Sequence, residues 1–234
     1  MRTAKTVLTV IQERGKQKKP IERVYKLLFN RELYLNAYAK LYPNNGAMTK
    51  GVTDETVDGM SIQKIDRMIE ILREEKYQWK PARREYIKKK NGKKRPLGIP
   101  VWGDKVLQEV MRQILEAYYE PQFSEHSHGF RPNRGCHTAL QEIQVWKGTR
   151  WFIEGDISQY FDTIDHKILL EILARNIHDG RFIRLVSNML EAGYLEEWKF
   201  NQTISGVPQG NLCRARHNPP YDEIDVMPRY VQYS

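Results

Sequence analysis

The chain has 234 residues, with 38 lysines and arginines against 29 aspartates and glutamates and a formal charge of +9. This excess of cations favours a polyanionic partner, and the length allows one large domain or two small ones. The sequence has neither an apolar run of about 18 residues nor a signal-like start, so we expect no membrane insertion, no export and a cytoplasmic location. Two cysteines, Cys136 and Cys213, are too few for a disulfide framework and fit a reducing compartment.

The first hundred residues predict helices followed by a hairpin. Apolar residues recur at helical spacing over 21–41, as one helix or two, and again over 61–79, with a stretch rich in turn formers between them. Segment 84–100 then predicts two strands joined by a tight turn at Asn91 and Gly92, because this pair readily supplies positive φ angles.

The rest of the chain alternates helices with short strands. Helical spacing recurs over 104–119, 138–146, 166–176 and 181–195, and Asp165 is placed to cap the third of these helices. A short strand at residues 152–153 is expected to lead to Asp156, and 196–211 predicts a strand that runs into a Pro-Gly turn. This order of elements indicates an α+β fold with an antiparallel sheet and packed helices.

Six cations surround the predicted hairpin turn. They are Lys88, Lys89, Lys90, Lys93, Lys94 and Arg95. Such a cluster could clamp a triphosphate or follow a nucleic-acid backbone, because both present repeated anionic oxygens. The alternative is an ordinary solvated hairpin tip.

The segment 123–140 offers two interpretations. Phe130 could stack on a base while Arg131 holds a phosphate. Alternatively, the segment could bind zinc through a set of four candidate ligands, namely His126, His128, Cys136 and His137. Their spacing matches no common structural zinc site, which disfavours the second interpretation.

Asp156 ends an apolar stretch and could hold a carboxylate rigidly at the end of a strand. Nucleotide polymerisation needs such carboxylates to hold two divalent ions about 3.5–4 Å apart. The peptide carbonyl of Ile157 is a second candidate ligand, and the ring of Phe161 could exclude a 2′-hydroxyl group and so favour deoxynucleotides. The alternative is a strand followed by a capped helix without any metal. Farther on, Gln209 lies in a Val-Pro-Gln-Gly turn and could contact an incoming nucleotide.

Taken together and in this order, several strings resemble the group II intron-encoded reverse transcriptase/maturase family. They are NAYAKLYPNNGAMTKGV, KKRPLGIP, HSHGFRPNRGCHTAL, DISQYFDTIDH and GVPQG. The resemblance implies the fingers and an incomplete palm of a right-hand polymerase fold. It divides the chain into a basic N-terminal segment (1–30), a fingers-like part (31–103), the remaining fingers with the incomplete palm (104–210) and a divergent tail (211–234).

The resemblance also implies roles for individual residues. Asp156 would be the first aspartate that binds Mg²⁺, with the carbonyl of Ile157 as a further ligand, and Phe161 would be the sugar gate. Lys89 and Arg95 would grip the triphosphate, and Gln209 would contact the nucleotide. The implied activity is RNA-directed DNA synthesis from a DNA primer on an RNA template, the intron RNA, with deoxynucleoside triphosphates.

After Gly210 the sequence departs from the family pattern. The family continues to a Tyr-Ala-Asp-Asp hairpin that supplies further metal-binding carboxylates, and no such string occurs in the 234 residues. We therefore expect this chain alone to be inactive, and we expect an incomplete palm to expose sheet edge and to favour self-association. The alternative function is a non-catalytic, maturase-like RNA-binding module. An RNA-templated RNA polymerase is disfavoured by Phe161.

Overall fold

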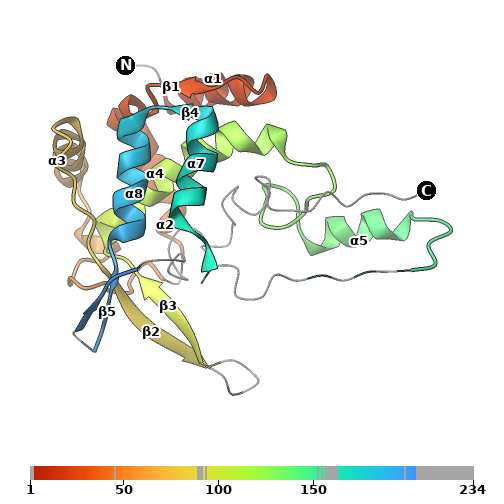
Figure 1. Cartoon of the computed structure of the whole chain (residues 1–234). Coiled ribbons are helices and arrows are strands. Elements are labelled where there is room, and N and C mark those ends of the chain that lie inside the picture. The colour runs from red at the N-terminus through yellow and green to blue at the C-terminus, as the bar shows by residue number, and fades with distance from the viewer. Residues whose placement is uncertain are drawn as a thin grey trace.

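The computed structural model describes residues 3–44, 46–88, 92, 94–151, 153, 155, 163–197 and 199–203, and for Lys88 and Arg95 it describes the backbone only. Helices form the body of the molecule, and a narrow sheet extends from it (Figure 1). The described helices are α1 (Ala4–Lys16), α2 (Arg31–Leu41), α3 (Ile62–Arg73), α4 (Trp102–Tyr119), α5 (Cys136–Gln144), α7 (His166–Asn176) and α8 (Gly180–Glu191), with short 3-10 helices η1 (Val24–Phe29), η2 (Val57–Gly59) and η3 (Glu120–Gln122).

Helix α4 lies at the centre of the helical body, and most of its residues are buried, including the charged residues Asp104, Glu109 and Arg112. Leu107 and Ile114, for example, have no exposed surface, and burial of such a side chain contributes about 1.5–3 kcal/mol. Helices α1 and α2 both pack against α4. Gly15 permits the close approach of α1, since a Cβ atom at this position would lie 2.0 Å from the carbonyl oxygen of Tyr118.

The predicted helices are present, but some of them begin or end at other residues than predicted, for local reasons. The helical pattern of 21–41 forms η1 and α2, separated at Asn30, whose side-chain oxygen accepts a hydrogen bond from the Glu32 amide at 3.0 Å and caps α2. The pattern of 181–195 stops earlier than predicted, because Gly193 adopts a φ of +70° and turns the chain into a strand. The prediction of Asp165 as a cap is confirmed, since its carboxylate accepts hydrogen bonds from the amides of Lys167 and Ile168 at 2.8 and 3.1 Å.

The main sheet has four strands in the order β3-β2-β5-β6, namely β3 (Lys94–Ile99), β2 (Ala82–Lys88), β5 (Tyr194–Glu196) and β6 (Lys199–Asn201). The hairpin of β2 and β3 is antiparallel as predicted, and β5 pairs antiparallel with β6. However, β2 pairs parallel with β5, so the sheet is mixed rather than antiparallel. A parallel neighbour is possible here because most of the helices separate these two strands in the chain. A second, parallel pair joins β1 (Ile21–Glu22) to β4 (Ile177–His178).

Helix α5 projects to one side of the body, while α7 and α8 pack together near α4 (Figure 1). The residues that follow α5 carry large apolar side chains on the surface, with Trp151 87% exposed and Ile153 84% exposed. The strand predicted to lead into Asp156 lies largely outside the described residues. Within the described part of the chain, no helix is both long and apolar enough to cross a membrane.

Candidate nucleic-acid interface

The predicted site residues fall into two groups. Those outside the described residues are Asp156, Ile157, Phe161, Gln209, Lys89, Lys90 and Lys93. For Lys88 and Arg95 the structure gives the strand that carries them, whereas Lys94, Phe130 and Arg131 are described in full. The catalytic and nucleotide-binding roles of the first group therefore remain predictions.

The hairpin of β2 and β3 places its basic residues at the end that lies away from the helical body (Figure 1). Lys88 pairs with Lys94 across the two strands, and Ile87 pairs with Arg95. Lys94 is exposed, and Gly92 adopts a φ of +77° in the turn between the strands. Because Gly92 has no Cβ atom, it accommodates this left-handed conformation without strain. The antiparallel hairpin is thus confirmed, whereas the arrangement of the other cations at its end remains a prediction.

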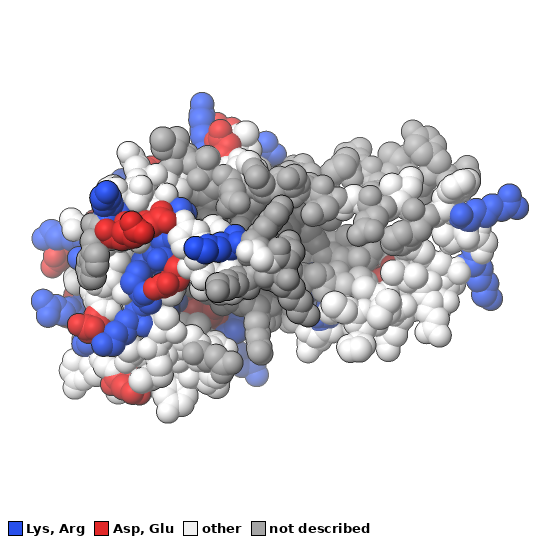
Figure 2. Space-filling view, turned by 90° about the horizontal axis from the view of Figure 1, so that it is seen from below, with Lys and Arg blue, Asp and Glu red and all other residues white. Residues whose placement is uncertain are grey.

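Closer to the body, cations alternate with acids. Seen from below, Figure 2 shows lysine and arginine side chains interspersed with aspartate and glutamate side chains on one part of the molecule. The structure also contains individual pairs: Lys50 lies 2.8 Å from Asp54, and Arg84 lies 3.7 Å from Glu196 and 3.4 Å from the centre of the Tyr194 ring. These cations are therefore partly neutralised by contacts within the protein.

The side chain of Arg131 is directed into its own loop. It is 8% exposed and donates hydrogen bonds to the Glu120 carboxylate at 3.0 and 3.1 Å and to the carbonyls of Ser124 and Ser127 at 2.6 and 3.0 Å. It also lies over the ring of Phe123. Every one of these contacts is made within the protein, so the guanidinium organises the loop, and its contact with a phosphate remains a prediction.

Phe130 precedes Arg131 and has a φ of +56°, which is an unusual backbone conformation for a bulky residue. Its ring is 48% exposed. Strained conformations persist only where the surroundings impose them, and the bonds of Arg131 on both sides of the loop supply that constraint. The loop therefore presents an aromatic ring at the surface, which is compatible with the predicted stacking on a base.

Two of the histidines in this segment contact a carboxylate. His128 Nε2 lies 2.6 Å from Glu142 Oε2 and its Nδ1 lies 2.8 Å from Thr138 Oγ1, while His126 contacts the other oxygen of Glu142. The hydrogen bonds from His128 and then His126 lower the pKa of Glu142. Among the described residues no group of three or more histidines, cysteines or acids is placed to hold a metal ion. The zinc interpretation thus gains no support.

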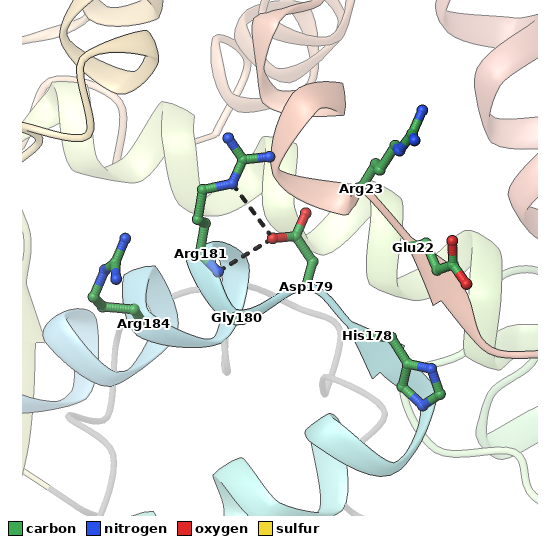
Figure 3. A pocket seen from close by; sticks show the side chains of 7 residues that line it. All are labelled: Glu22, Arg23, His178, Asp179, Gly180, Arg181 and Arg184. Carbon is green, nitrogen blue, oxygen red and sulfur yellow. Dashed lines mark hydrogen bonds and ion pairs between the residues drawn. The ribbon is translucent and has the colours of Figure 1, made fainter.

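A pocket of about 530 Å³ opens between the N-terminal segment and the start of α8 (Figure 3). It is lined by Glu22, Arg23, His178, Asp179, Gly180, Arg181 and Arg184. Asp179 caps α8 through the Arg181 amide at 3.1 Å and also accepts a hydrogen bond from the Tyr25 amide at 2.9 Å. Arg181 and Arg184 are paired with acids, including Glu75. Arg181 and Arg184 are therefore partly neutralised by the acids that they contact.

The comparison with protein families gives one match, to the reverse transcriptase (RNA-dependent DNA polymerase) family, over residues 87–213. The chain belongs to this family. The match begins in β2 of the basic hairpin and continues beyond the predicted Pro-Gln-Gly turn. It therefore includes nearly every residue that the sequence singled out as a nucleotide or metal ligand.

Relatives place this reverse transcriptase in the group II intron branch. The chain is 50% identical to the group II intron-encoded protein LtrA of Lactococcus lactis subsp. cremoris over 192 residues, which cover 81% of the chain and 32% of that relative. It is 46% identical to an uncharacterized 91 kDa protein in the cob intron of Schizosaccharomyces pombe over 217 residues, 89% of the chain and 27% of that relative. It is 36% identical to nuclear intron maturase 1, mitochondrial, of Arabidopsis thaliana over 93 residues, 39% of the chain and 13% of that relative. The chain thus spans about a third or less of their length.

Two residues at the base of the hairpin were not predicted from the sequence. Lys105 and Arg83 both donate hydrogen bonds to backbone carbonyls of the loop 46–50. The only signal in the sequence for Lys105 was a lysine three residues after a tryptophan in the first turn of a helix with many apolar residues, 102–119. Such a lysine must find acceptors when the helix is buried.

Proposed function

We propose that this chain supplies the fingers and the first palm carboxylate of an RNA-directed DNA polymerase of the group II intron type. The enzyme extends a DNA primer along an RNA template, the intron RNA, with deoxynucleoside triphosphates. The observation that carries the proposal is the family match over 87–213, which contains the basic hairpin, the Asp156 motif and the Pro-Gln-Gly turn in one order. In this proposal residues 31–103 belong to the fingers and residues 104–210 complete the fingers and begin the palm.

Each predicted residue acts through its own chemistry. Lys89 and Arg95 bind triphosphate oxygens, because cationic donors form short, strong hydrogen bonds with phosphates. Phe161 excludes a 2′-hydroxyl group by its size, and Gln209 contacts the incoming nucleotide through its amide. The other hairpin lysines bind nucleic-acid phosphates without regard to sequence.

Asp156 and the carbonyl of Ile157 fit Mg²⁺, because this ion prefers hard oxygen donors of the carboxylate and carbonyl kind. When bound, the ion supplies positive charge that stabilises the reacting phosphates. In this proposal the contribution of the chain is the Asp156 carboxylate that binds the ion.

Residues 1–234 on their own are proposed to bind RNA without extending a primer. A two-metal site needs more than one carboxylate, and the 234 residues contain no Tyr-Ala-Asp-Asp string. The second candidate function, a non-catalytic RNA-binding module, is favoured by the formal charge of +9 and the density of cations in the hairpin.

One experiment tests RNA binding and the proposed inactivity of the chain together. The chain and its Asp156→Ala variant are compared for binding to poly(A) RNA and for primer extension with dTTP and Mg²⁺. We expect both proteins to bind RNA equally, and we expect neither to extend the primer. Extension that depends on Asp156 would overturn the proposed inactivity, and failure of the unaltered chain to bind RNA would contradict both candidate functions.

We also propose that the chain associates with itself, in the cytoplasm, when it is produced alone. Supporting this are exposed apolar side chains on and after α5, with Leu140 62% exposed and Val145 69% exposed. Sedimentation velocity at increasing concentration tests the proposal, since a concentration-independent monomer would contradict it.

A further inference from the structure

The loop 46–51 lies at the base of the β2–β3 hairpin and is fixed there by two cationic side chains. Lys105, in the first turn of α4, donates hydrogen bonds from Nζ to the carbonyl of Thr49 at 3.0 Å and to that of Gly46 at 3.3 Å. The ammonium also lies 5.8 Å from the centre of the Trp102 ring, which is buried. Charged donors form stronger hydrogen bonds than neutral ones, so this contact holds the two ends of the 46–49 turn together.

The next carbonyl in the same loop holds Arg83. The oxygen of Lys50 accepts hydrogen bonds from Arg83 Nε at 3.1 Å and from a terminal guanidinium nitrogen at 2.9 Å. Arg83 lies in β2, opposite Ile99 of β3, in the same hairpin that carries the predicted triphosphate ligands. The same guanidinium also contacts the Glu85 carboxylate of β2, so the loop and Glu85 together position it at the base of the fingers.

The loop can take this position because of one glycine. A Cβ atom at residue 51 would lie 2.8 Å from the amide nitrogen of Val101 and 2.9 Å from the carbonyl carbon and oxygen of Pro100. Both neighbours are backbone and cannot move independently, so only glycine allows the loop to approach the start of α4. Ala47 adds a buried contact, being 5% exposed.

We propose that Lys105 is a positioning residue for the nucleic-acid site: its ammonium fixes the loop 46–51, and through the Lys50 carbonyl the loop fixes Arg83 at the base of the fingers. This inference rests on the proposed function, because the hairpin matters only if it binds nucleotide or nucleic acid. Lys105 is not proposed to touch either ligand. Its effect is transmitted by backbone carbonyls.

The charge on Lys105 makes the arrangement sensitive to pH. Burial, and to a smaller degree the nearby guanidinium of Arg83, lower the pKa of Lys105 to about 8. Among the other charged groups of the adjoining segments, Lys50 is paired with Asp54, and Asp104 accepts hydrogen bonds from Tyr77 and the Lys80 amide. At neutral pH the ammonium is charged and holds the loop, whereas above about pH 8 the neutral amine is a weaker donor.

Hydrogen exchange of the full chain measures this directly. The probe is the Thr49 amide, which donates to the Gly46 carbonyl at 3.2 Å, with rates corrected for the intrinsic effect of pH. From about pH 7 to about pH 9.5 we expect its protection in the unaltered chain to fall by about tenfold. Lys105→Arg, which keeps its charge, should remain protected throughout, and Lys105→Met should be unprotected at every pH.

The matched control is Lys64→Met, which removes a lysine of α3 whose ion-pair partner, Glu55, lies outside the loop 46–51. It should leave exchange of the loop unchanged. Gly51→Ala should deprotect the loop without any change of charge. A flat pH profile in the unaltered chain, or equal protection in Lys105→Met, would overturn the proposal, and the profile of Lys105→Arg decides the matter even if the methionine variant fails to fold.

Binding of poly(A) RNA separates this inference from the function on which it rests. Lys105→Met should bind RNA several-fold more weakly than Lys64→Met, although both lose one charge, and Lys105→Arg should restore the affinity. If the unaltered chain binds RNA and all three variants bind equally, the positioning role is wrong. If the unaltered chain binds no RNA, the proposed function fails, whereas the exchange data still report on the loop.

Discussion

Arg131 donates two hydrogen bonds to a single carboxylate oxygen of Glu120, at 3.0 and 3.1 Å. The pair joins the end of the central helical region to the loop that precedes α5, and the same guanidinium reaches two carbonyls of that loop. Arg131, which the sequence suggests as a phosphate ligand, thus stabilises the loop before α5 through hydrogen bonds within the protein. If Arg131 stabilises the loop, its replacement should lower stability, whereas if it binds phosphate, its replacement should weaken RNA binding.

Arg131→Ala should lower the free energy of unfolding by roughly 2 kcal/mol or more, because it leaves the Glu120 carboxylate and two carbonyls without their donor. Arg134→Ala, which removes a half-buried arginine that donates a hydrogen bond to the Glu125 carbonyl, is the control and should lower the free energy of unfolding less. Urea denaturation measures both. Unchanged stability together with weaker RNA binding would show that Arg131 serves the nucleic acid instead.

Gly15→Ala should destabilise the chain by roughly 1–3 kcal/mol, because the added methyl group collides with the backbone carbonyl of Tyr118 and forces α1 away from α4. Gly180→Ala in the first turn of α8 is the matched control, since nothing lies within 4 Å of a Cβ atom there. Thermal unfolding of both variants checks the prediction. Equal melting temperatures would mean that α1 does not pack as closely as described.

Asp104 should make stability depend on pH in the mildly acidic range. Its carboxyl group is buried, and burial raises its pKa to about 6, against the opposing effect of the hydrogen bonds from Tyr77 and the Lys80 amide. Because the pKa in the folded state is higher than in the unfolded state, the associated stabilisation is complete below the ordinary pKa of 3.8 and is lost as the pH rises through about 6. Its full size is about 3 kcal/mol.

The measurement compares unfolding free energies of the unaltered chain and Asp104→Asn between about pH 4 and pH 7. Other acids contribute equally to both proteins, so the difference isolates Asp104. We expect the free energy of unfolding of the unaltered chain to rise relative to that of the variant as the pH falls. A difference that does not change with pH would contradict the raised pKa.

Lys94→Ala should weaken binding to single-stranded RNA and reduce the slope of log K against log salt concentration by about 0.7, the value for one phosphate contact. Lys64→Ala, a lysine of α3 that pairs with Glu55, should leave the slope unchanged. Filter binding at several salt concentrations tests both. Identical slopes for the two variants would mean that the hairpin tip is merely solvated.

Local features of the fold could be predicted from the sequence, and distant ones could not. The cap at Asp165 and the antiparallel hairpin that contains Gly92 depend on residues close in the chain, and their chemistry is specific. The parallel pairing of β2 with β5 depends on how the intervening helices pack, which no short pattern records. The residues of the candidate site also include some that the sequence predicts and others that it does not. The role of Lys105 could not be predicted from the sequence, because its hydrogen-bond acceptors are backbone carbonyls, which every residue has.

The central claim concerns Asp156, and it is tested most directly by completing the polymerase. Residues 1–210 are joined to the remaining part of the Lactococcus lactis relative, and primer extension on poly(A) RNA with dTTP and Mg²⁺ is measured for the hybrid and two variants. Asp156→Ala should abolish synthesis, while Asp165→Asn, which removes a nearby carboxylate but retains a good helix cap, should leave it nearly intact. Synthesis that survives in Asp156→Ala would contradict the account.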